Sequence, residues 1–236
     1  MTASLSKSLA LAALAASALS AGAAYADDGF SFNAGAVTEY RYRGVSQSNL
    51  KPAAQGGIDY AHSSGFYVGT WASTIKWLEK ANYELDIYGG YKGEIRPGLA
   101  YDVGVLRYQY VDSAFANTNE VYGALTYGVV TAKYSHSTTN LFGAADSKGS
   151  GYLDLSASFD LGNGMTLVPH LGRQIVKNSG ASSYTDYAIT LNKDLGQGLS
   201  ASLSYIDLNK VLKASATQPD KDMGAARLVA GIKYSF

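Results

Sequence analysis

Two arginines, one residue apart, are the first residues here whose type and spacing suggest chemistry. Arg41 and Arg43 alternate with Tyr40 and Tyr42, and Gly44 follows. Only 16% of the residues are charged, so the pair stands out. Guanidinium groups bind phosphate and carboxylate groups. Three settings therefore need to be weighed: a nucleic-acid interface, a catalytic pair, and one polar face of a β-strand.

The charge balance argues against a nucleic-acid interface. The chain carries 19 Lys and Arg against 19 Asp and Glu, so it lacks the basic excess that neutralises phosphates. It contains no Cys, which excludes disulfides, thiol chemistry and Cys-based metal sites. We predict no nucleic-acid partner.

The first 26 residues have the pattern of a cleaved secretory signal. A lone basic residue, Lys7, precedes a run of Leu and Ala, and the segment closes on Ala24-Tyr25-Ala26. A single membrane anchor is the alternative, but Ser17, Ser20 and Gly22 interrupt the apolar run. We therefore predict a signal peptide over residues 1–26 and an exported domain over residues 27–236.

The histidines give no catalytic or metal-binding pattern. His62, His136 and His170 lie in separate segments, without the spacing of metal ligands. Residues 135–137 read Ser-His-Ser, but neighbours on a strand point to opposite faces, which hinders a Ser–His hydrogen bond. A lipid hydrolase embedded in the membrane would need a Ser–His–Asn motif, which we do not find. We predict no enzyme, no cofactor and no metal site.

The elements that position the arginines follow from hydrophobic alternation. In residues 151–161, Leu and Phe alternate with Asp and Ser, and residues 198–206 repeat the pattern. Such a period of two predicts strands with one apolar and one polar face. Twelve segments read this way: 29–42, 53–63, 65–75, 82–93, 98–111, 118–128, 130–138, 150–161, 164–175, 183–194, 198–209 and 224–236.

The connections between these segments alternate between short turns and longer polar stretches. An even number of antiparallel strands with this asymmetry is typical of an outer-membrane β-barrel, and spanning strands of about 9–11 residues fit it. We therefore predict an all-β, up-and-down antiparallel transmembrane barrel of about twelve strands with periplasmic termini, ten or fourteen strands being the alternative if one segment is split or merged. A soluble sandwich or lipocalin-like barrel is the alternative. It is disfavoured because the apolar set is thin for a packed core and Tyr recurs near strand ends.

In this barrel the opening pair takes an inward position on the first strand, residues 29–42. A charged side chain facing lipid costs about 2–4 kcal/mol at mid-membrane, so Arg41 and Arg43 should face the lumen and Tyr40 and Tyr42 the lipid. The candidates for lining or constricting the pore are Glu39, Arg41, Arg43, Ser46, Gln47, Asp59, Glu84 and Asp86. Two alternatives stay open: a constriction that selects anionic or small polar solutes, and ion pairs that simply fill the barrel.

One strand breaks the alternation. In residues 98–111, Val103 and Val105 share a face with Arg107 and Gln109. We predict a β-bulge nearby that would redirect the polar pair.

The last strand carries a recognisable end. Residues 228–236 alternate and finish on Phe236, with Tyr234 and Gly231 before it. A terminal strand of this kind resembles the signal read by the barrel-assembly machinery of bacterial outer membranes. The alternative is an ordinary amphipathic strand.

Residues 37–73 resemble the opening of the TorF-family porins of proteobacteria. The resemblance is carried by three motifs: Tyr40, Arg41, Arg43, Gly44, Ser46, Gln47, Ser48; Pro52, Ala53, Gln55, Gly56, Gly57; and Gly69, Thr70, Trp71, Ala72, Ser73. It implies an outer-membrane barrel that acts as a pore. We further expect residues 46–48 to fold inward at the mouth, the alternative being an ordinary loop anchor.

Together these features predict a porin-like channel of the Gram-negative outer membrane, through which small polar or charged solutes diffuse passively. We expect a monomer whose partners are outer-membrane lipids, the barrel-assembly machinery and the solutes. The alternative is a plugged barrel that serves as a structural or surface-interaction protein, read mostly through its loops.

Overall fold

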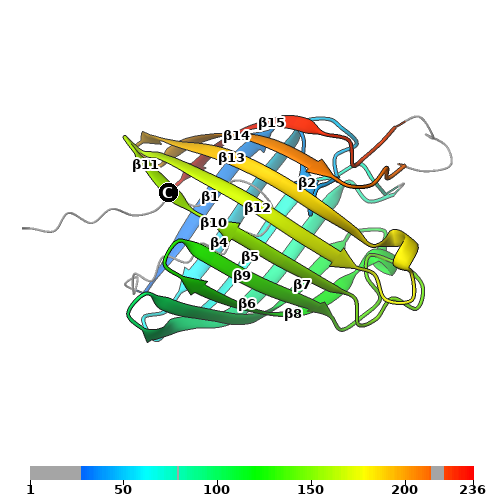
Figure 1. Ribbon diagram of the computed structural model, residues 1–236, viewed down its shortest axis with the longest axis horizontal. Helices are drawn as coiled ribbons and strands as arrows, with labels where there is room; N and C mark the ends of the chain where they lie inside the picture. Colours follow the sequence, from blue (N-terminus) through cyan, green and yellow to red (C-terminus); the bar gives the residue numbers. More distant parts are fainter. Residues whose placement is uncertain (1–27, 79, 214–220) are drawn as a thin grey trace, which may run out of the picture.

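The chain forms a closed β-barrel (Figure 1). The structure, a computed structural model, describes residues 28–78, 80–213 and 221–236, so the predicted signal peptide lies outside the described residues. In the barrel wall, successive strands pair antiparallel, with β10 and β11 sharing the neighbour β12, and the first strand pairs with the last, β1 with β15. The predicted all-β antiparallel barrel is confirmed.

The wall contains thirteen strand segments at twelve strand positions, here called staves. The segments β10 and β11 share one position, because both pair with β12. Their bounds are β1 Gly29–Val37, β4 Ala53–Ala61, β5 Phe66–Thr74, β6 Tyr83–Arg96, β7 Leu99–Tyr110, β8 Thr118–Tyr127, β9 Val130–Ser137, β10 Gly151–Ala157, β11 Phe159–Gly162, β12 Met165–Ile175, β13 Tyr184–Gly196, β14 Leu199–Leu208 and β15 Arg227–Ser235. Two short strands, β2 (Arg41–Tyr42) and β3 (Val45–Ser46), form a separate pair.

The two faces of the barrel wall have opposite chemistry, as the alternation predicts. Leu153 and Leu155 on β10 are about half exposed on the outer face. Ser200, Ser202 and Ser204 on β14 are buried and face inward. An apolar exterior around a polar interior is the inverse of a soluble sandwich, whose apolar faces pack together.

Aromatic rings gather on the outer face at the end of the barrel that carries the short turns, here called the turn end. Phe30, Phe32, Tyr60, Tyr234 and Phe236 form a continuous set with ring centroids 5.0–6.5 Å apart. The backbone of Phe236 exchanges two hydrogen bonds with that of Phe32, which fixes the end of the chain to the first strand. The described chain therefore begins and ends at the turn end. Within residues 28–78, 80–213 and 221–236, no helix has the length and apolar character needed to cross a membrane.

The predicted first strand is wrong beyond Val37. Residues 38–52, here called the inner loop, leave the wall and return through the β2–β3 pair before β4 begins. Tyr40 and Tyr42, expected on the lipid face, are buried instead. The alternation was read correctly, but a short hairpin alternates just as a wall strand does, so the pattern alone did not reveal where the wall ends.

The predicted bulge in β7 is also wrong. β7 pairs with β8 without interruption from Leu99 to Tyr108, and its only register shift against β6 lies at Glu94 and Arg96. Arg107 and Gln109 therefore stay on the outer face of the barrel. Near the end that carries the long connections, here called the loop end, a polar outer face needs no redirection.

Two glycines at the turn end provide a matched test of turn geometry. Gly98 and Gly198 both have a φ of +80°, but an added Cβ meets nothing at Gly98 and overlaps the carbonyl oxygen of Ser235 at Gly198. We expect Gly98→Ala to lower the free energy of unfolding by about 1 kcal/mol, the cost of a left-handed conformation. We expect Gly198→Ala to lower the free energy of unfolding by about 1–3 kcal/mol more than Gly98→Ala, because the backbone at Ser235 would have to shift. Denaturant unfolding followed by the fluorescence of Trp71 and Trp77 measures both, and equal losses would contradict this account.

Candidate functional site

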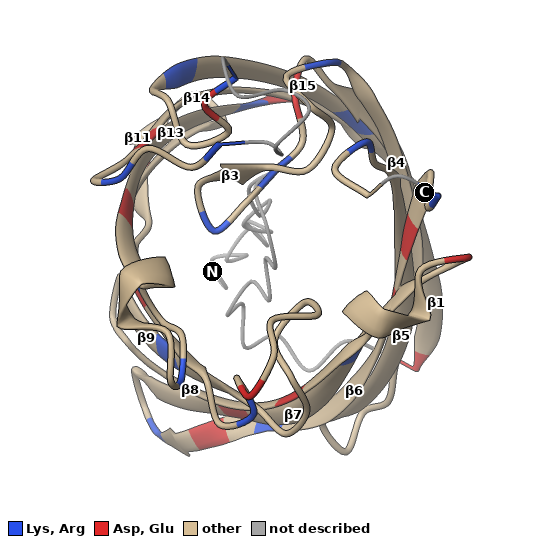
Figure 2. Cartoon of the chain, turned by 90° about the vertical axis from the view of Figure 1, so that its right-hand side faces the viewer, with Lys and Arg blue, Asp and Glu red and all other residues tan. Residues whose placement is uncertain are grey.

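The inner loop occupies the lumen at the loop end of the barrel. Viewed along the barrel axis from that end, β3 lies inside the ring of wall strands (Figure 2). The pair is held by the register Arg41 with Ser46 and Tyr42 with Val45. The backbone amide of Ser46 in β3 also donates a hydrogen bond of 2.9 Å to the carbonyl of Met223, which lies in the connection between β14 and β15.

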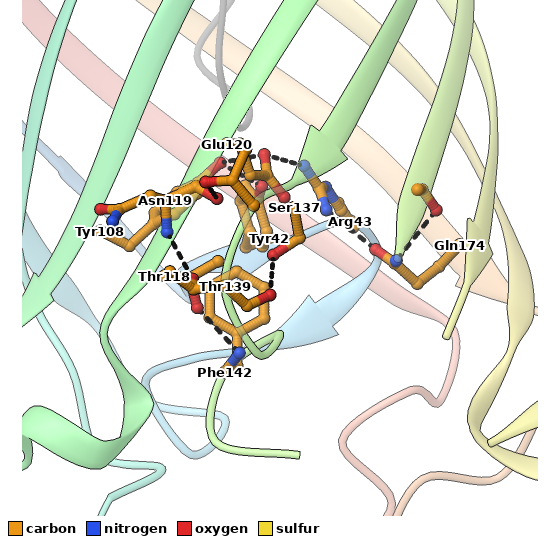
Figure 3. Close-up of polar contacts among 12 residues, drawn as sticks. Tyr42, Arg43, Tyr108, Thr118, Asn119, Glu120, Ser137, Thr139, Phe142 and Gln174 are labelled. Atoms are coloured by element: carbon orange, nitrogen blue, oxygen red, sulfur yellow. Dashed lines mark hydrogen bonds and ion pairs between the residues drawn. The ribbon is translucent and has the colours of Figure 1, made fainter. Parts of the chain in front are cut away.

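Arg43 is the main link between the inner loop and the wall. Its guanidinium donates to Glu120 on β8 at 2.7 Å and to Gln174 on β12 at 2.9 Å (Figure 3). It also lies over the rings of Tyr42 and Tyr152, at 4.7 and 4.3 Å from their centroids. Because β8 and β12 are separated by two staves, this one side chain joins distant parts of the wall.

The tyrosines anchor the inner loop to a different part of the wall. The hydroxyl of Tyr40 donates to Glu84 on β6 at 2.6 Å. The hydroxyl of Tyr42 is hydrogen-bonded to that of Tyr108 on β7, and its ring packs edge-on against Phe142. Phe142 belongs to the long connection between β9 and β10, so a second loop contributes to the same packing. Their burial follows from these partners.

A tight turn between β2 and β3 makes this seating possible. Arg43 and Gly44 both have positive φ, +49° and +80°. A Cβ on Gly44 would come within 2.7 Å of the Cβ of Asp186 on β13. Glycine is therefore required twice at this position, for the backbone conformation and for the close approach to the wall.

The hydrogen bonds of Arg41 to described residues are made within the inner loop and not with the wall. Its Nε donates to Glu39 at 2.8 Å and its Nη1 to the carbonyl of Gly44 at 2.9 Å, while Nη2 has no hydrogen-bond partner in the described part of the chain. Burial lowers the pKa of Arg41 below its ordinary value, opposed by the charge of Glu39. Burial is the largest influence on Arg43 and acts against its charge, but Glu120, Tyr42 and Tyr108 together outweigh it, and the pKa of Arg43 lies well above the ordinary value.

The lumen on the turn side of the inner loop is polar and carries both signs of charge. Hydrogen bonds and ring contacts pair many of these groups: Tyr67 donates to Asp102 at 2.6 Å, and the Lys133 ammonium lies 4.1 Å from the ring centroid of Tyr122. Inward-facing strand positions carry the carboxylates Asp59, Glu84, Asp86, Asp102, Glu120, Asp154 and Asp186 and the cations Lys92, Lys133, Arg227 and Lys233. One oxygen of Asp86 has no hydrogen-bond partner among the described residues.

His170 on β12 belongs to the same lumen. Its two ring nitrogens lie 3.4 Å from Asp154 and 2.9 Å from Asp186. Tyr152 donates to Asp186 at 3.0 Å, and its ring also contacts the guanidinium of Arg43. The hydrogen bonds and ion pairs of His170 in the described part of the chain are with Tyr152, Asp154 and Asp186, and no group of three or more potential metal ligands occurs among the described residues.

The candidate residues fall into two sets. Glu39, Arg41, Arg43, Ser46 and Gln47 all lie in the inner loop, not on a wall strand. Asp59, Glu84 and Asp86 lie on the wall, and Glu84 is the only one of the three hydrogen-bonded to the inner loop in the contacts described above.

The sequence reading missed Glu120, the ion-pair partner of Arg43. The signal for it was present, because Val121, Leu125 and Tyr127 place Glu120 on the inward face of β8. What the sequence did not supply was the pairing, since Arg43 and Glu120 are 77 residues apart.

The geometry agrees with the comparisons to known proteins. Residues 20–236 match a family described as "Bacterial protein of unknown function (Gcw_chp)". The chain belongs to this family. No curated protein matches the sequence. The name TorF rests on the sequence resemblance alone.

Solved porin structures share the fold of this Gcw_chp-family chain. The KdgM porin in complex with disordered oligogalacturonate has a TM-score of 0.59 at 9% identity, covering 87% of this chain and 99% of its own. The NanC porin has a TM-score of 0.57 at 11% identity, covering 88% and 99%. The outer membrane protein Omp33 of Acinetobacter baumannii has a TM-score of 0.51 at 7% identity, covering 89% and 99%. At these identities the likeness concerns the fold.

The Arg43–Glu120 pair predicts a strong energetic coupling between the inner loop and the wall. Breaking a buried ion pair from one side leaves the other charge uncompensated and costs about 3–5 kcal/mol. We expect Arg43→Met and Glu120→Gln each to lower the free energy of unfolding by about that amount, and the double variant by less than their sum. The exposed Arg96→Met is the control and should change stability by less than about 0.5 kcal/mol. Additive losses in a denaturant double-mutant cycle would contradict the pairing.

Proposed function

We propose that this protein is an outer-membrane pore through which small polar solutes diffuse. The observation that carries the proposal is the closed barrel with an apolar outer face and a charged, polar lumen. A barrel of this kind places its outer face in lipid and satisfies every wall hydrogen bond between strands. Its likeness in fold to KdgM, NanC and Omp33 supports the same class.

The inner loop is the selective element of this pore. It narrows the lumen at the loop end, so a solute must pass beside the β2–β3 hairpin. Arg43 has Glu120 and Gln174 as partners and therefore acts by shaping the passage rather than as a free counter-ion. Carboxylates outnumber lysines and arginines together at the inward strand positions, which disfavours an anionic solute such as the oligogalacturonate named with KdgM.

The remaining features of the proposal concern the cell. The protein would lie in the Gram-negative outer membrane as a monomer, with its turn end and termini in the periplasm. The terminal strand with Gly231, Tyr234 and Phe236 would be read by the barrel-assembly machinery. Transport would need no cofactor and no energy input, and we infer no enzymatic activity.

A second candidate function is a closed barrel that works through its loops. The observation that favours it is the number of bonds holding the inner loop to the wall, through Tyr40, Tyr42 and Arg43. In that case the lumen would be filled rather than gated, and the role of the protein would be structural or surface-interacting.

Single-channel conductance in a planar bilayer separates the two functions. The refolded mature protein is compared with the Arg41→Ala/Arg43→Ala double variant, and with Tyr83→Ala, an exposed outer-face residue, as the control. We expect steady openings of the wild type, with higher conductance and altered ion selectivity in the double variant, because the passage loses two large side chains and Glu39 and Glu120 lose their cationic partners. Tyr83→Ala should match the wild type.

The other outcomes are equally informative. Openings only in the double variant would favour the closed barrel plugged by its inner loop. Silence of all three proteins, each shown to be folded, would overturn the channel proposal.

A further inference from the structure

Arg107 is an exposed arginine on the outer face of the barrel. It alternates with the buried inward residues Leu106 and Tyr108, and lies three residues from the loop end of β7. Its Nε donates to the side-chain oxygen of Gln109 at 3.1 Å, and its Nη1 to that of Asn119 on β8, also at 3.1 Å. No carboxylate among residues 28–78, 80–213 and 221–236 forms an ion pair with it.

Arg107, Gln109 and Asn119 are here called the cluster. The two hydrogen bonds between them determine which polar groups the cluster leaves exposed on the outer face. An amide side chain has one oxygen that accepts and one NH₂ group that donates. In Gln109 and Asn119 the oxygens face the guanidinium, so both NH₂ groups remain, together with Nη2 of Arg107. The cluster is therefore rich in donors and carries one uncompensated positive charge. Such a group is suited to a phosphate, whose oxygens accept charge-assisted hydrogen bonds.

A shallow, open apolar depression, here called the groove, lies beside this cluster on the outer face. In the sheet register, Val68, Gly89, Val105 and Val121 follow one another across β5, β6, β7 and β8. Gly89 contributes no side chain to this row, which leaves a depression between its neighbours. The groove is lined by Phe66, Gly89, Tyr91, Val103, Val105 and Val121, with Tyr67, Gly90, Gly104 and Tyr122 beneath them in the wall.

The groove and the cluster share one strand. Val105 and Val103 are two and four residues from Arg107 on the same face of β7, about 7 and 13 Å along the strand. Ile87, an exposed residue of β6, is the cross-strand partner of Arg107 and continues the apolar surface. Charged donors thus meet an apolar channel in the order in which a phospholipid presents its headgroup and its acyl chain.

We propose that Arg107, Gln109 and Asn119 bind the phosphate of an anionic lipid headgroup, with one acyl chain of that lipid in the groove at Gly89. The site lies on β5–β8, which are neighbours in the barrel wall (Figure 1), and its exposed residues Val103, Val105 and Val121 lie on the outer face. It requires a barrel in a membrane and is independent of whether the lumen conducts. Its natural control is Arg173 on β12, a second exposed outward arginine, which donates to Thr185 and lies on a strand that contributes no residue to the groove.

Native mass spectrometry of the folded mature barrel, released from detergent, tests the site. The probes are phosphatidylglycerol, diacylglycerol and inorganic phosphate, each added separately. We expect one phosphatidylglycerol to be retained and the other two probes to be lost, because both the charge and the chain are recognised. Arg107→Gln should reduce retention about tenfold, since it removes the charged donor of the cluster. Arg173→Gln should leave retention unchanged.

A second variant tests the groove without altering charge. Val105→Trp fills the depression beside Gly89 and should also reduce retention of phosphatidylglycerol, while far-ultraviolet circular dichroism verifies the barrel. Equal losses in Arg107→Gln and Arg173→Gln would show non-specific attraction and overturn the site. Retention of inorganic phosphate alone, or of diacylglycerol as well as phosphatidylglycerol, would overturn it too. Unaltered retention in Val105→Trp would remove the acyl chain from the proposal.

Discussion

The structure depends on the pairing of β1 with β15. A sheet whose outer face is apolar and whose inner face is polar has two free edges until its first and last strands meet, and free edges in an apolar surrounding leave backbone groups without partners. Residues Asn33–Val37 of β1 pair with Gly231–Ser235 of β15, and Phe236 extends the contact to Phe32. Closure therefore fixes both ends of the described chain at one end of the barrel. It also sends every long connection to the other end, where the inner loop arises.

Once the barrel is closed, its lumen must be either hydrated or filled. In this chain the inner loop partly fills the lumen at the loop end, and polar side chains line it toward the turn end. At the loop end the hairpin of the inner loop occupies the lumen and shares its charges with the wall, chiefly through Arg43 and Glu120. Toward the turn end the wall offers Tyr67, Tyr122, Asp102 and Lys133 in local pairs. Arg41, Arg43 and Lys133 are tolerable inside the barrel because each has a carboxylate or an aromatic ring close by, and the pairing of Arg43 makes the inner loop part of the fold.

On the outer face it is the polar side chains, and not the apolar ones, that are exceptional. Most of it is apolar and aromatic, so each polar side chain there requires its own explanation. Arg107 and its amide neighbours stand near the loop end of β7, where the exterior turns from apolar to polar. Sequence reasoning treated this departure from the alternation as a defect in the strand. The regular ladder with β8 shows instead that the strand is intact and that the surroundings of its outer face change along its length.

The sequence by itself indicated about twelve wall strands, their approximate bounds and, along those wall strands, the inward or outward face of most residues, because alternation is a local property of two neighbouring residues. For the same reason it identified Arg43, Glu84 and Asp86 as inward groups. Only the tertiary structure decided that β1 ends at Val37 and that Tyr40 and Tyr42 turn inward, because a wall strand and a hairpin share one alternation. It also decided that Arg43 meets Glu120 and Gln174, 77 and 131 residues away. Such partners depend on strand register and barrel closure, which no local pattern encodes.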